Sequence, residues 1–276
     1  MHLDEPRLCA YYCGESTQMK LGFPLFVLSV PPRLRIHTLA AACLLVAAAG
    51  CSTPKGSGEI NDPYEAHNRE VHAANIELDR ALVRPSANGF GKAVPVPVQN
   101  GLSNFADNLS LPGVVVNNLL QFDIGNAIEN TVRFALNTTV GLAGVLDPAA
   151  AIGLQGKDTD FGATLHVWGV PEGAYLELPV LGPSTERDAV GKVVDLFIDP
   201  LNNLLPSPEK YIGTAAKVAS RIGDRSRYSG IIDGILYDSA DSYAQARLLY
   251  LQNRRYDLGD VSHDENFDPY EDPYAK

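Results

Sequence analysis

All four cysteines of the chain lie within its first 51 residues, at Cys9, Cys13, Cys43 and Cys51. The last of them ends the stretch RLRIHTLAAACLLVAAAGC, in which two arginines precede an apolar run that is too short to cross a bilayer comfortably. Small residues come directly before Cys51, as in a signal for lipoprotein processing, although the usual leucine is replaced by Ala48. We therefore predict cleavage before Cys51 and lipidation of that cysteine.

Two other interpretations of these cysteines stay open. An ordinary secretory signal could end beside a chance cysteine. Cys9 and Cys13 could form a metal or redox pair, but no second pair follows them. After cleavage the mature chain would keep Cys51 alone, and this excludes both a disulfide framework and a cysteine-bound metal.

Four segments are expected along the chain. Residues 1–50 comprise an upstream extension, which we attribute to a start codon placed too early, and the signal peptide that is removed. Residues 51–60 form a lipidated polar tether. Residues 61–256 form one folded domain, and residues 257–276, with seven acidic residues and one lysine, form a disordered tail.

The charge of the mature chain limits its partners. The whole chain has 22 Lys and Arg against 33 Asp and Glu. Removal of residues 1–50 leaves 18 basic and 30 acidic residues, a formal charge of −12. Such a chain is a poor partner for nucleic acid and has no basic patch for anionic lipid. Contact with a membrane must then be apolar or covalent.

Helical periodicity dominates the mature chain and predicts a mostly α fold with little or no β. Asp62 is expected to cap a first helix that ends at Arg84-Pro85. Residues 94–98 are expected to be extended, and Asn117-Asn118 should interrupt the apolar residues 111–122. Asp123 should cap a helix that runs to about Ala143, and residues 164–181 could form a hairpin around Pro171-Glu172-Gly173. Further helices are expected to carry Val190 to Ile198, Ile212 to Ile222 and Leu236 to Tyr250.

The helix after Asp123 has two unlike faces. Ile128, Val132 and Leu136 belong to an apolar stripe. A polar stripe on the other side recurs every three or four residues, at Asn126, Asn130, Arg133 and Asn137. The surrounding stretch, residues 111–154, could be embedded in a membrane or could be a buried core. The mature chain contains no apolar run of transmembrane length.

No motif for covalent chemistry occurs in the mature chain. GxSxG, HExxH and GxxxxGK[ST] patterns are all absent, and His67 and His72 are spaced five apart, so they do not stack as ligands one helical turn apart. We therefore expect neither an enzyme nor a cofactor or metal site. Two alternatives remain: a lipid-modifying enzyme with a site assembled from distant residues, and a structural scaffold lipoprotein of the cell envelope.

Several segments in unbroken order resemble the MlaA (VacJ) family of outer-membrane phospholipid-transport lipoproteins. They are NDPYEAHNR at 61–69, VRP at 83–85, NGLSNFADNLSLPGVVVNNLLQ at 100–121, RFALNTTVGLAGVLDPAAAIGL at 133–154 and DFGATLHVWGVPEGAYLELPVLGPSTERDAVGKVVD at 160–195. The sequence departs from the family at His72 to Asn75, where aromatic-Asn repeats are usual, and at Phe122, where glycine is usual.

The resemblance implies a single ring-like helical domain whose amphipathic helices lie in the periplasmic leaflet of the outer membrane, held there by the lipid anchor. It implies removal of mislocalised phospholipids from the outer leaflet through a polar channel, and so maintenance of lipid asymmetry. The implied partners are phospholipids, porin trimers and a periplasmic lipid carrier. Asn126, Asn130, Arg133 and Asn137 would then line the lipid path, with Arg133 facing the phosphate. A solvated helix face, or an Arg133 that reaches the interface, is the alternative.

Overall fold

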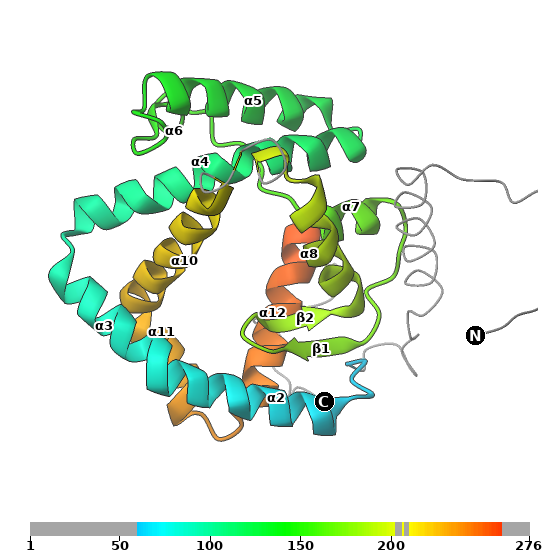
Figure 1. Cartoon of the computed structure of the whole chain (residues 1–276). Coiled ribbons are helices and arrows are strands. Elements are labelled where there is room, and N and C mark those ends of the chain that lie inside the picture. Colours follow the sequence, from blue (N-terminus) through cyan, green and yellow to red (C-terminus); the bar gives the residue numbers. More distant parts are fainter. Residues whose placement is uncertain (1–59, 202–205, 207–209, 261–276) are drawn as a thin grey trace, which may run out of the picture. The chain divides into compact units, whose positions relative to one another are not determined.

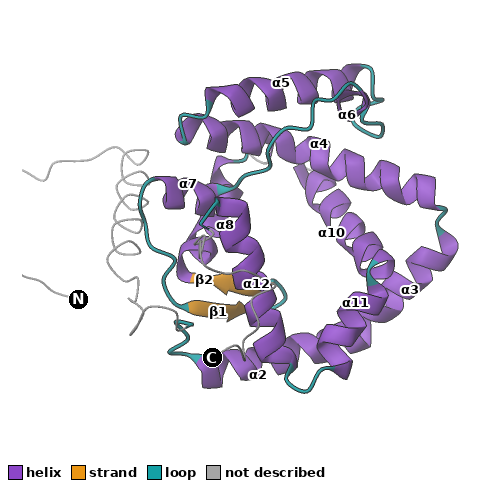
Figure 2. Ribbon diagram, turned by 180° about the vertical axis from the view of Figure 1, so that it is seen from behind, coloured by secondary structure: helices purple, strands orange, loops and turns teal. Residues whose placement is uncertain are grey.

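The computed structural model describes residues 60–201, 206 and 210–260, all within the unit Leu45–Lys276. Cys51, the tether up to residue 59 and most of the acidic tail lie outside these residues. Helices dominate the described part, as expected, and one short hairpin accompanies them (Figure 2). The elements follow the order α2 (Glu65–Leu78), η1 (Asp79–Val83), α3 (Arg84–Ala93), α4 (Val96–Leu120), α5 (Ile124–Thr139), α6 (Pro148–Ala151), α7 (Phe161–Val167), β1 (Tyr175–Leu178), β2 (Gly182–Thr185), α8 (Glu186–Ile198), α10 (Lys210–Arg227), α11 (Ser229–Asp233), η2 (Gly234–Asp238) and α12 (Ser242–Leu258).

The first helix does not end at Arg84-Pro85, so that expectation was wrong. A π-helical turn, η1, joins α2 directly to α3, and Pro85 stands at the start of α3. Proline has no N–H to donate and its ring clashes in a regular helix, whereas the wider turn accommodates it. Asp62 is not a helix cap either: it accepts hydrogen bonds from Asn68 Nδ2 at 3.0 Å and from the Tyr243 hydroxyl at 2.5 Å.

Helix α4 is longer and more continuous than expected. It starts at Val96 with Pro97 in its first turn and passes through Asn117 and Asn118 without a break. Both asparagines are buried and have distant partners. Asn117 Nδ2 donates to Asp195 Oδ1 at 2.9 Å, and Asn118 Oδ1 accepts from Asn130 Nδ2 at 3.0 Å. Tertiary hydrogen bonds therefore replace the solvent that these polar side chains would need in isolation.

The hairpin was placed too early in the chain. Strands β1 and β2 pair antiparallel with Tyr175 opposite Thr185 and Leu178 opposite Gly182, so the turn lies at residues 179–181. Residues 161–167 form α7 instead, because the Asp160 carboxylate accepts from the Ala163 N–H at 2.7 Å and caps that helix. Tyr175 packs with Tyr243 and Leu251 of α12 in a small apolar core.

Contacts between the elements close a circuit (Figure 1). Helix α2 leads through η1 to α3, and both α3 and α4 contact α10. Helix α4 also contacts α5, α7 and α8. Helix α8 contacts the hairpin, and β1 returns to α2. This arrangement agrees with the expected ring-like helical domain. Helix α12 runs to Leu258 and ends at Gly259 with φ 73°, two residues beyond the expected limit of the helical part.

Candidate functional site

The polar face of α5 packs against α4 and against the segment that follows α5. The Asp123 carboxylate starts α5, as expected, by accepting from the Asn126 N–H at 3.1 Å. The helix ends at Thr139, one turn earlier than the sequence suggested. Asn130 and Asn137 are only 1% and 3% exposed. A solvated polar face is therefore excluded for these two asparagines.

Each of the inner polar residues of α5 has a defined partner. Asn130 Nδ2 donates to Asn118 Oδ1 and to the Lys157 carbonyl, both at 3.0 Å. Asn137 Nδ2 donates to Asp147 Oδ1 at 2.9 Å. Arg133 donates to Asp147 Oδ2 at 3.2 Å and to the Gln155 carbonyl. These bonds hold the segment 147–157 against α5.

The fourth predicted residue behaves differently. Asn126 Nδ2 donates to Asp123 Oδ2 at 2.7 Å, at the N-terminal end of α5. It is not one of the residues around the cavity that the other three border. The structure thus brings together Asn130, Arg133 and Asn137 and leaves Asn126 apart.

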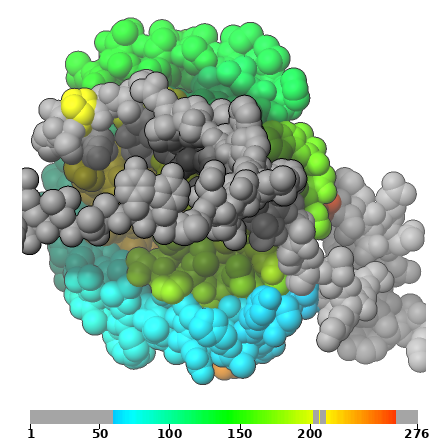
Figure 3. Space-filling model, turned by 45° about the vertical axis from the view of Figure 1, so that its right-hand side comes forward, coloured from blue at the N-terminus to red at the C-terminus, as the bar shows by residue number. Residues whose placement is uncertain are grey.

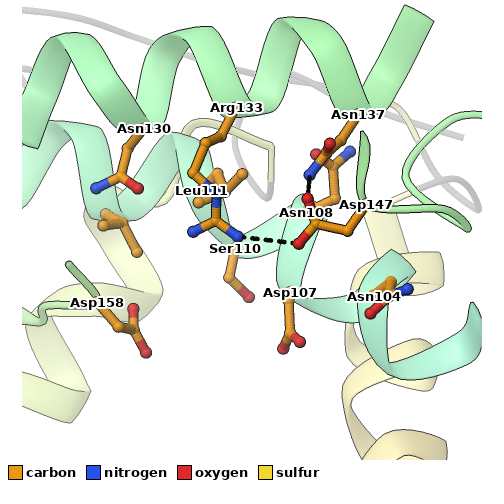
Figure 4. A pocket seen from close by; sticks show the side chains of 11 residues that line it. Asn104, Asp107, Asn108, Ser110, Leu111, Asn130, Arg133, Asn137, Asp147 and Asp158 are labelled. Carbon is orange, nitrogen blue, oxygen red and sulfur yellow. Dashed lines mark hydrogen bonds and ion pairs between the residues drawn. The ribbon is translucent and has the colours of Figure 1, made fainter. Parts of the chain in front are cut away.

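A polar cavity of about 310 Å³ lies between α4, α5 and the segment after α5 (Figure 4). Asn130, Arg133 and Asn137 form its α5 side, while Asp147 and Asp158 come from the following segment. The remaining lining residues belong to α4 and are Asn104, Asp107, Asn108, Ser110, Leu111 and Val114.

A second polar cavity, of about 450 Å³, continues from the first along α4. The two cavities share Asp107, Ser110, Val114 and Asp158. The second is bordered by six carboxylates and by two basic side chains, Lys217 and Arg221. The carboxylates are Asp107, Asp158, Asp160, Asp195, Asp199 and Asp224.

The carboxylates of these cavities titrate in different directions. Partial burial raises the pKa of Asp107 and of Asp158 above the usual carboxyl value, and the neighbouring charge of Asp158 adds to the effect at Asp107. Burial also raises the pKa of Asp195. At Asp147 burial acts in the same direction, but hydrogen bonds from the Ala150 N–H, Asn137 and Arg133 bring the pKa below its usual value. The lining therefore favours positively charged groups.

The opposite face of α5 is apolar and exposed. Ile124, Ile128 and Val132 lie along it, and Ile128 is 61% exposed. Phe122, just before α5, is 85% exposed. Figure 3 shows the atoms of α5, in green, at the surface. The core interpretation of this helix face was therefore wrong. None of the described helices is both long and apolar enough to span a membrane.

A family model for "MlaA lipoprotein" matches residues 60–257. The chain belongs to the MlaA lipoprotein family. The "intermembrane phospholipid transport system lipoprotein MlaA" of Escherichia coli (strain K12) is 34% identical over 250 residues, 88% of this chain and 95% of that relative. An uncharacterized protein of Rickettsia bellii is 32% identical over 218 residues, 79% of this chain and 84% of that relative.

A solved structure supports the same family. It comes from work described as "Structural basis for maintenance of bacterial outer membrane lipid asymmetry" and matches this MlaA-family chain with a TM-score of 0.61 at 30% identity. The match covers 71% of this chain and 98% of that chain. The resemblance inferred from the sequence segments is thus confirmed.

Sequence reasoning missed most of the α4 side of the site in this family member. Asn104, Asp107, Asn108 and Leu111 follow the spacing i, i+3, i+4 and i+7, which places them on one helix face. The stretch NFADNLSL carries this spacing, and the apolar residues 111–122 that follow it indicate contact with a membrane rather than a polar site. Asp158 and Arg221 carried no local signal, because only the tertiary contacts bring them to the cavities.

The described residues contain no group of three or more His, Cys, Asp or Glu side chains able to hold a metal ion. His72, one of the two histidines considered from the sequence, is buried. Its Nδ1 lies 3.3 Å from Glu177 Oε1 and its Nε2 lies 3.2 Å from Ser242 Oγ. These contacts tie α2 to the hairpin and α12, so His72 has a structural role away from the cavities.

Proposed function

We propose that this chain removes mislocalised phospholipids from the outer leaflet of the outer membrane and passes them inward, which maintains the lipid asymmetry of that membrane. The observation that carries the proposal is the pair of adjoining polar cavities along α4, the first of which is bordered by α5, a helix whose other face is apolar and exposed. The names borne by the relatives, which include phospholipid transport, support the same function.

The physical argument concerns the headgroup. A charged or zwitterionic headgroup crosses hydrocarbon only at a high cost in free energy, because it loses its water without gaining partners. A polar path beside an apolar surface supplies partners for the headgroup while the acyl chains stay in an apolar phase. Such a path needs no nucleophile, metal or cofactor, so we assign transport rather than catalysis.

The polar path in this proposal includes Asn130, Arg133 and Asn137. Their side chains border the first cavity and also hold segment 147–157 in place. They would therefore shape the path as well as touch the lipid. Asn126 lies beside Asp123 instead, and we give it no part in the path.

The anchor and partners complete the proposal. Cys51 would carry the acyl chains that hold the protein in the periplasmic leaflet, since stable anchoring needs more than one chain. The apolar face of α5 would lie among lipid tails of the same leaflet. Porin trimers would hold the protein near the outer leaflet, and a soluble periplasmic carrier would take the lipid onward.

The test measures phospholipid on the cell surface by its accessibility to an added phospholipase. Cells that lack this chain should expose more phospholipid than wild-type cells, and the wild-type gene should restore the low level. Arg133→Ala and Asn137→Leu should restore it only in part at equal protein level, whereas Lys92→Gln on the exposed side of α3 should restore it fully. An unchanged surface after deletion would overturn the transport function. Release of fatty acid or headgroup by the purified chain would favour the enzyme alternative.

Anchoring is tested separately. Cys51→Ala should abolish the mass increase of the mature N-terminus and release the protein from the membrane fraction. Unchanged retention, together with an unmodified wild-type N-terminus, would contradict lipidation at this residue.

A further inference from the structure

The second polar cavity, bordered by six carboxylates, is called the acidic cavity here. A third cavity, of about 730 Å³, lies next to it and is largely apolar. Apolar side chains from η1, α4, α8 and α10 form most of its wall, among them Phe105, Leu109, Val218 and Ile222. Val180 and Leu181, from the turn of the hairpin, also border it. A largely apolar cavity with a few charged groups at one side is the usual form of a site for an amphiphilic ligand.

The apolar and acidic cavities meet at four residues. Leu196 and Asp199 come from the end of α8, and Lys217 and Arg221 come from α10. Lys217 and Arg221 are four residues apart, so they lie one helical turn apart on the same face. These two are also the only cations among the residues that line the acidic cavity.

Both cations can bind a ligand. Lys217 Nζ forms a long ion pair with Asp199 Oδ2, at 3.9 Å and without a hydrogen bond, and the Lys217 side chain is 44% exposed. Arg221 has no hydrogen bond or ion pair with any described residue and is exposed. Arg133, which the family resemblance implies to face the phosphate, already donates to Asp147 and to the Gln155 carbonyl. The arginine that is free to bind an anion is therefore Arg221 and not Arg133.

We infer that Lys217 and Arg221 bind the phosphodiester of a glycerophospholipid whose acyl chains occupy the apolar cavity. This inference rests on the proposed transport function and adds a site for one step of it. A phosphodiester would be repelled by the six carboxylates of the acidic cavity, so it needs local cations at its edge. Guanidinium and ammonium groups are the usual partners of phosphate oxygens.

The order of the three surfaces matches the order of groups in the lipid. The apolar cavity binds the acyl chains, and Lys217 and Arg221 bind the phosphate. The carboxylates of the acidic cavity surround the headgroup alcohol that is attached to the phosphate. A headgroup that ends in an ammonium would be attracted by those carboxylates. Free inorganic phosphate has no apolar part, so the apolar wall would add nothing to its binding affinity. The site therefore selects an intact phospholipid over a soluble phosphate ester.

The experiment measures binding to the full lipidated chain in a fixed concentration of a neutral maltoside detergent. The probes are dihexanoyl phosphatidylethanolamine below its micelle-forming concentration, glycerophosphate as the phosphate without tails, and dihexanoylglycerol as the tails without phosphate. The double variant Lys217→Gln/Arg221→Gln should weaken binding of the phospholipid tenfold or more and leave dihexanoylglycerol unchanged. Lys217→Arg should keep most of the affinity, and Lys92→Gln is the matched control for loss of one exposed positive charge.

A second variant tests the tail cavity without removing any charge. A Cβ built on Gly213 would lie 3.9 Å from Leu109 Cδ1, an ordinary contact, so Gly213→Leu adds bulk to the apolar cavity without forcing the helix to shift. Helix propensity also favours this change. It should weaken binding of the phospholipid severalfold and leave binding of glycerophosphate as it was.

Three results would overturn the inference. They are phospholipid binding by the double variant within twofold of wild type, glycerophosphate binding as tight as that of the phospholipid, and no effect of Gly213→Leu on the phospholipid. The surface-phospholipid assay separates these results from a failure of the transport function. A chain that clears surface phospholipid but binds it independently of Lys217 and Arg221 keeps its function and loses this site.

Discussion

Arg225 of α10 holds Asp79 of the π-helical turn η1 in a two-point ion pair. Its Nε lies 2.9 Å from Asp79 Oδ1 and its Nη2 lies 2.8 Å from Asp79 Oδ2, although 146 residues separate the two in sequence. Two further hydrogen bonds complete the cluster: Arg225 Nη2 donates to Asp233 Oδ1 at 2.6 Å, and the Tyr237 hydroxyl donates to Asp79 Oδ2 at 2.7 Å. The cluster joins the turn that replaces the expected helix end to the helix that borders two of the cavities.

Asp79→Asn should lower the stability of the protein clearly. The change removes the charge that Arg225 faces in a buried place, and loss of one partner of such a pair costs about 2–3 kcal/mol. For a domain of this size the midpoint of thermal unfolding should fall by about 5–10 °C, followed by circular dichroism in detergent. Arg80→Ala breaks the exposed pair with Glu77 and the contact of the guanidinium with the Tyr237 ring, and should cost only about 1 kcal/mol or less. Equal shifts for both variants would contradict this role of the cluster.

Asn130→Leu should loosen segment 147–157. It removes two hydrogen bonds from a side chain that is 1% exposed and leaves the buried Asn118 Oδ1 without that donor. The expected loss is about 2 kcal/mol of unfolding free energy. Amide hydrogen exchange should rise within 147–157 in particular. Asn253→Leu on the exposed side of α12 is the matched control, and similar exchange in both variants would count against the prediction.

The stability of the protein should fall in acid, in part through Asp188. Burial acts to raise the pKa of this carboxyl, but hydrogen bonds and charge from Arg254 and a hydrogen bond from Tyr250 outweigh it and hold the pKa below its usual value. A carboxyl with a depressed folded-state pKa binds fewer protons when folded. Its contribution is therefore full above the unfolded value of about 4 and is lost as the pH falls below it.

Asp188→Asn should therefore lower the unfolding midpoint near neutral pH and flatten its decline between about pH 5 and pH 3. Thermal unfolding across this range measures both effects. Glu70→Gln on the exposed face of α2 should show the same dependence of the unfolding midpoint on pH as the wild type. A decline in Asp188→Asn as steep as in the wild type would show that other carboxyl groups govern acid unfolding.

The apolar face of α5 should contact lipid directly. Ile128 is 61% exposed and Val132 40% exposed, and water is an unfavourable neighbour for such a face. A photo-crosslinking residue at either position should label phospholipid in the membrane. The same residue at Tyr250, whose hydroxyl donates to Asp188, should label it weakly. Labelling at Ile128 no stronger than at Tyr250 would place this face against protein.

The sequence by itself determined what depends on near neighbours in the chain. Helical periodicity, the Asp123 cap and the unlike faces of α5 are local properties, since a helix places residues three and four apart side by side. The unbroken order of the segments that resemble the MlaA family was equally sufficient to identify the family. The continuation through Pro85 was not predictable in this way, because a π-helical turn forms only where contacts such as Arg225 with Asp79 stabilise it.

Only the tertiary structure decided how the site is assembled. Asn117 and Asn118 looked like a break in an apolar run, because polar side chains need partners and their partners lie on other elements. The polar stripe of α5 indicated which residues face inward, but its facing wall comes from α4 and from Asp158. Lys217 and Arg221 could be recognised as a candidate site only from the two cavities that they border. A cavity results from packing between elements that are distant in sequence, and no local pattern predicts it.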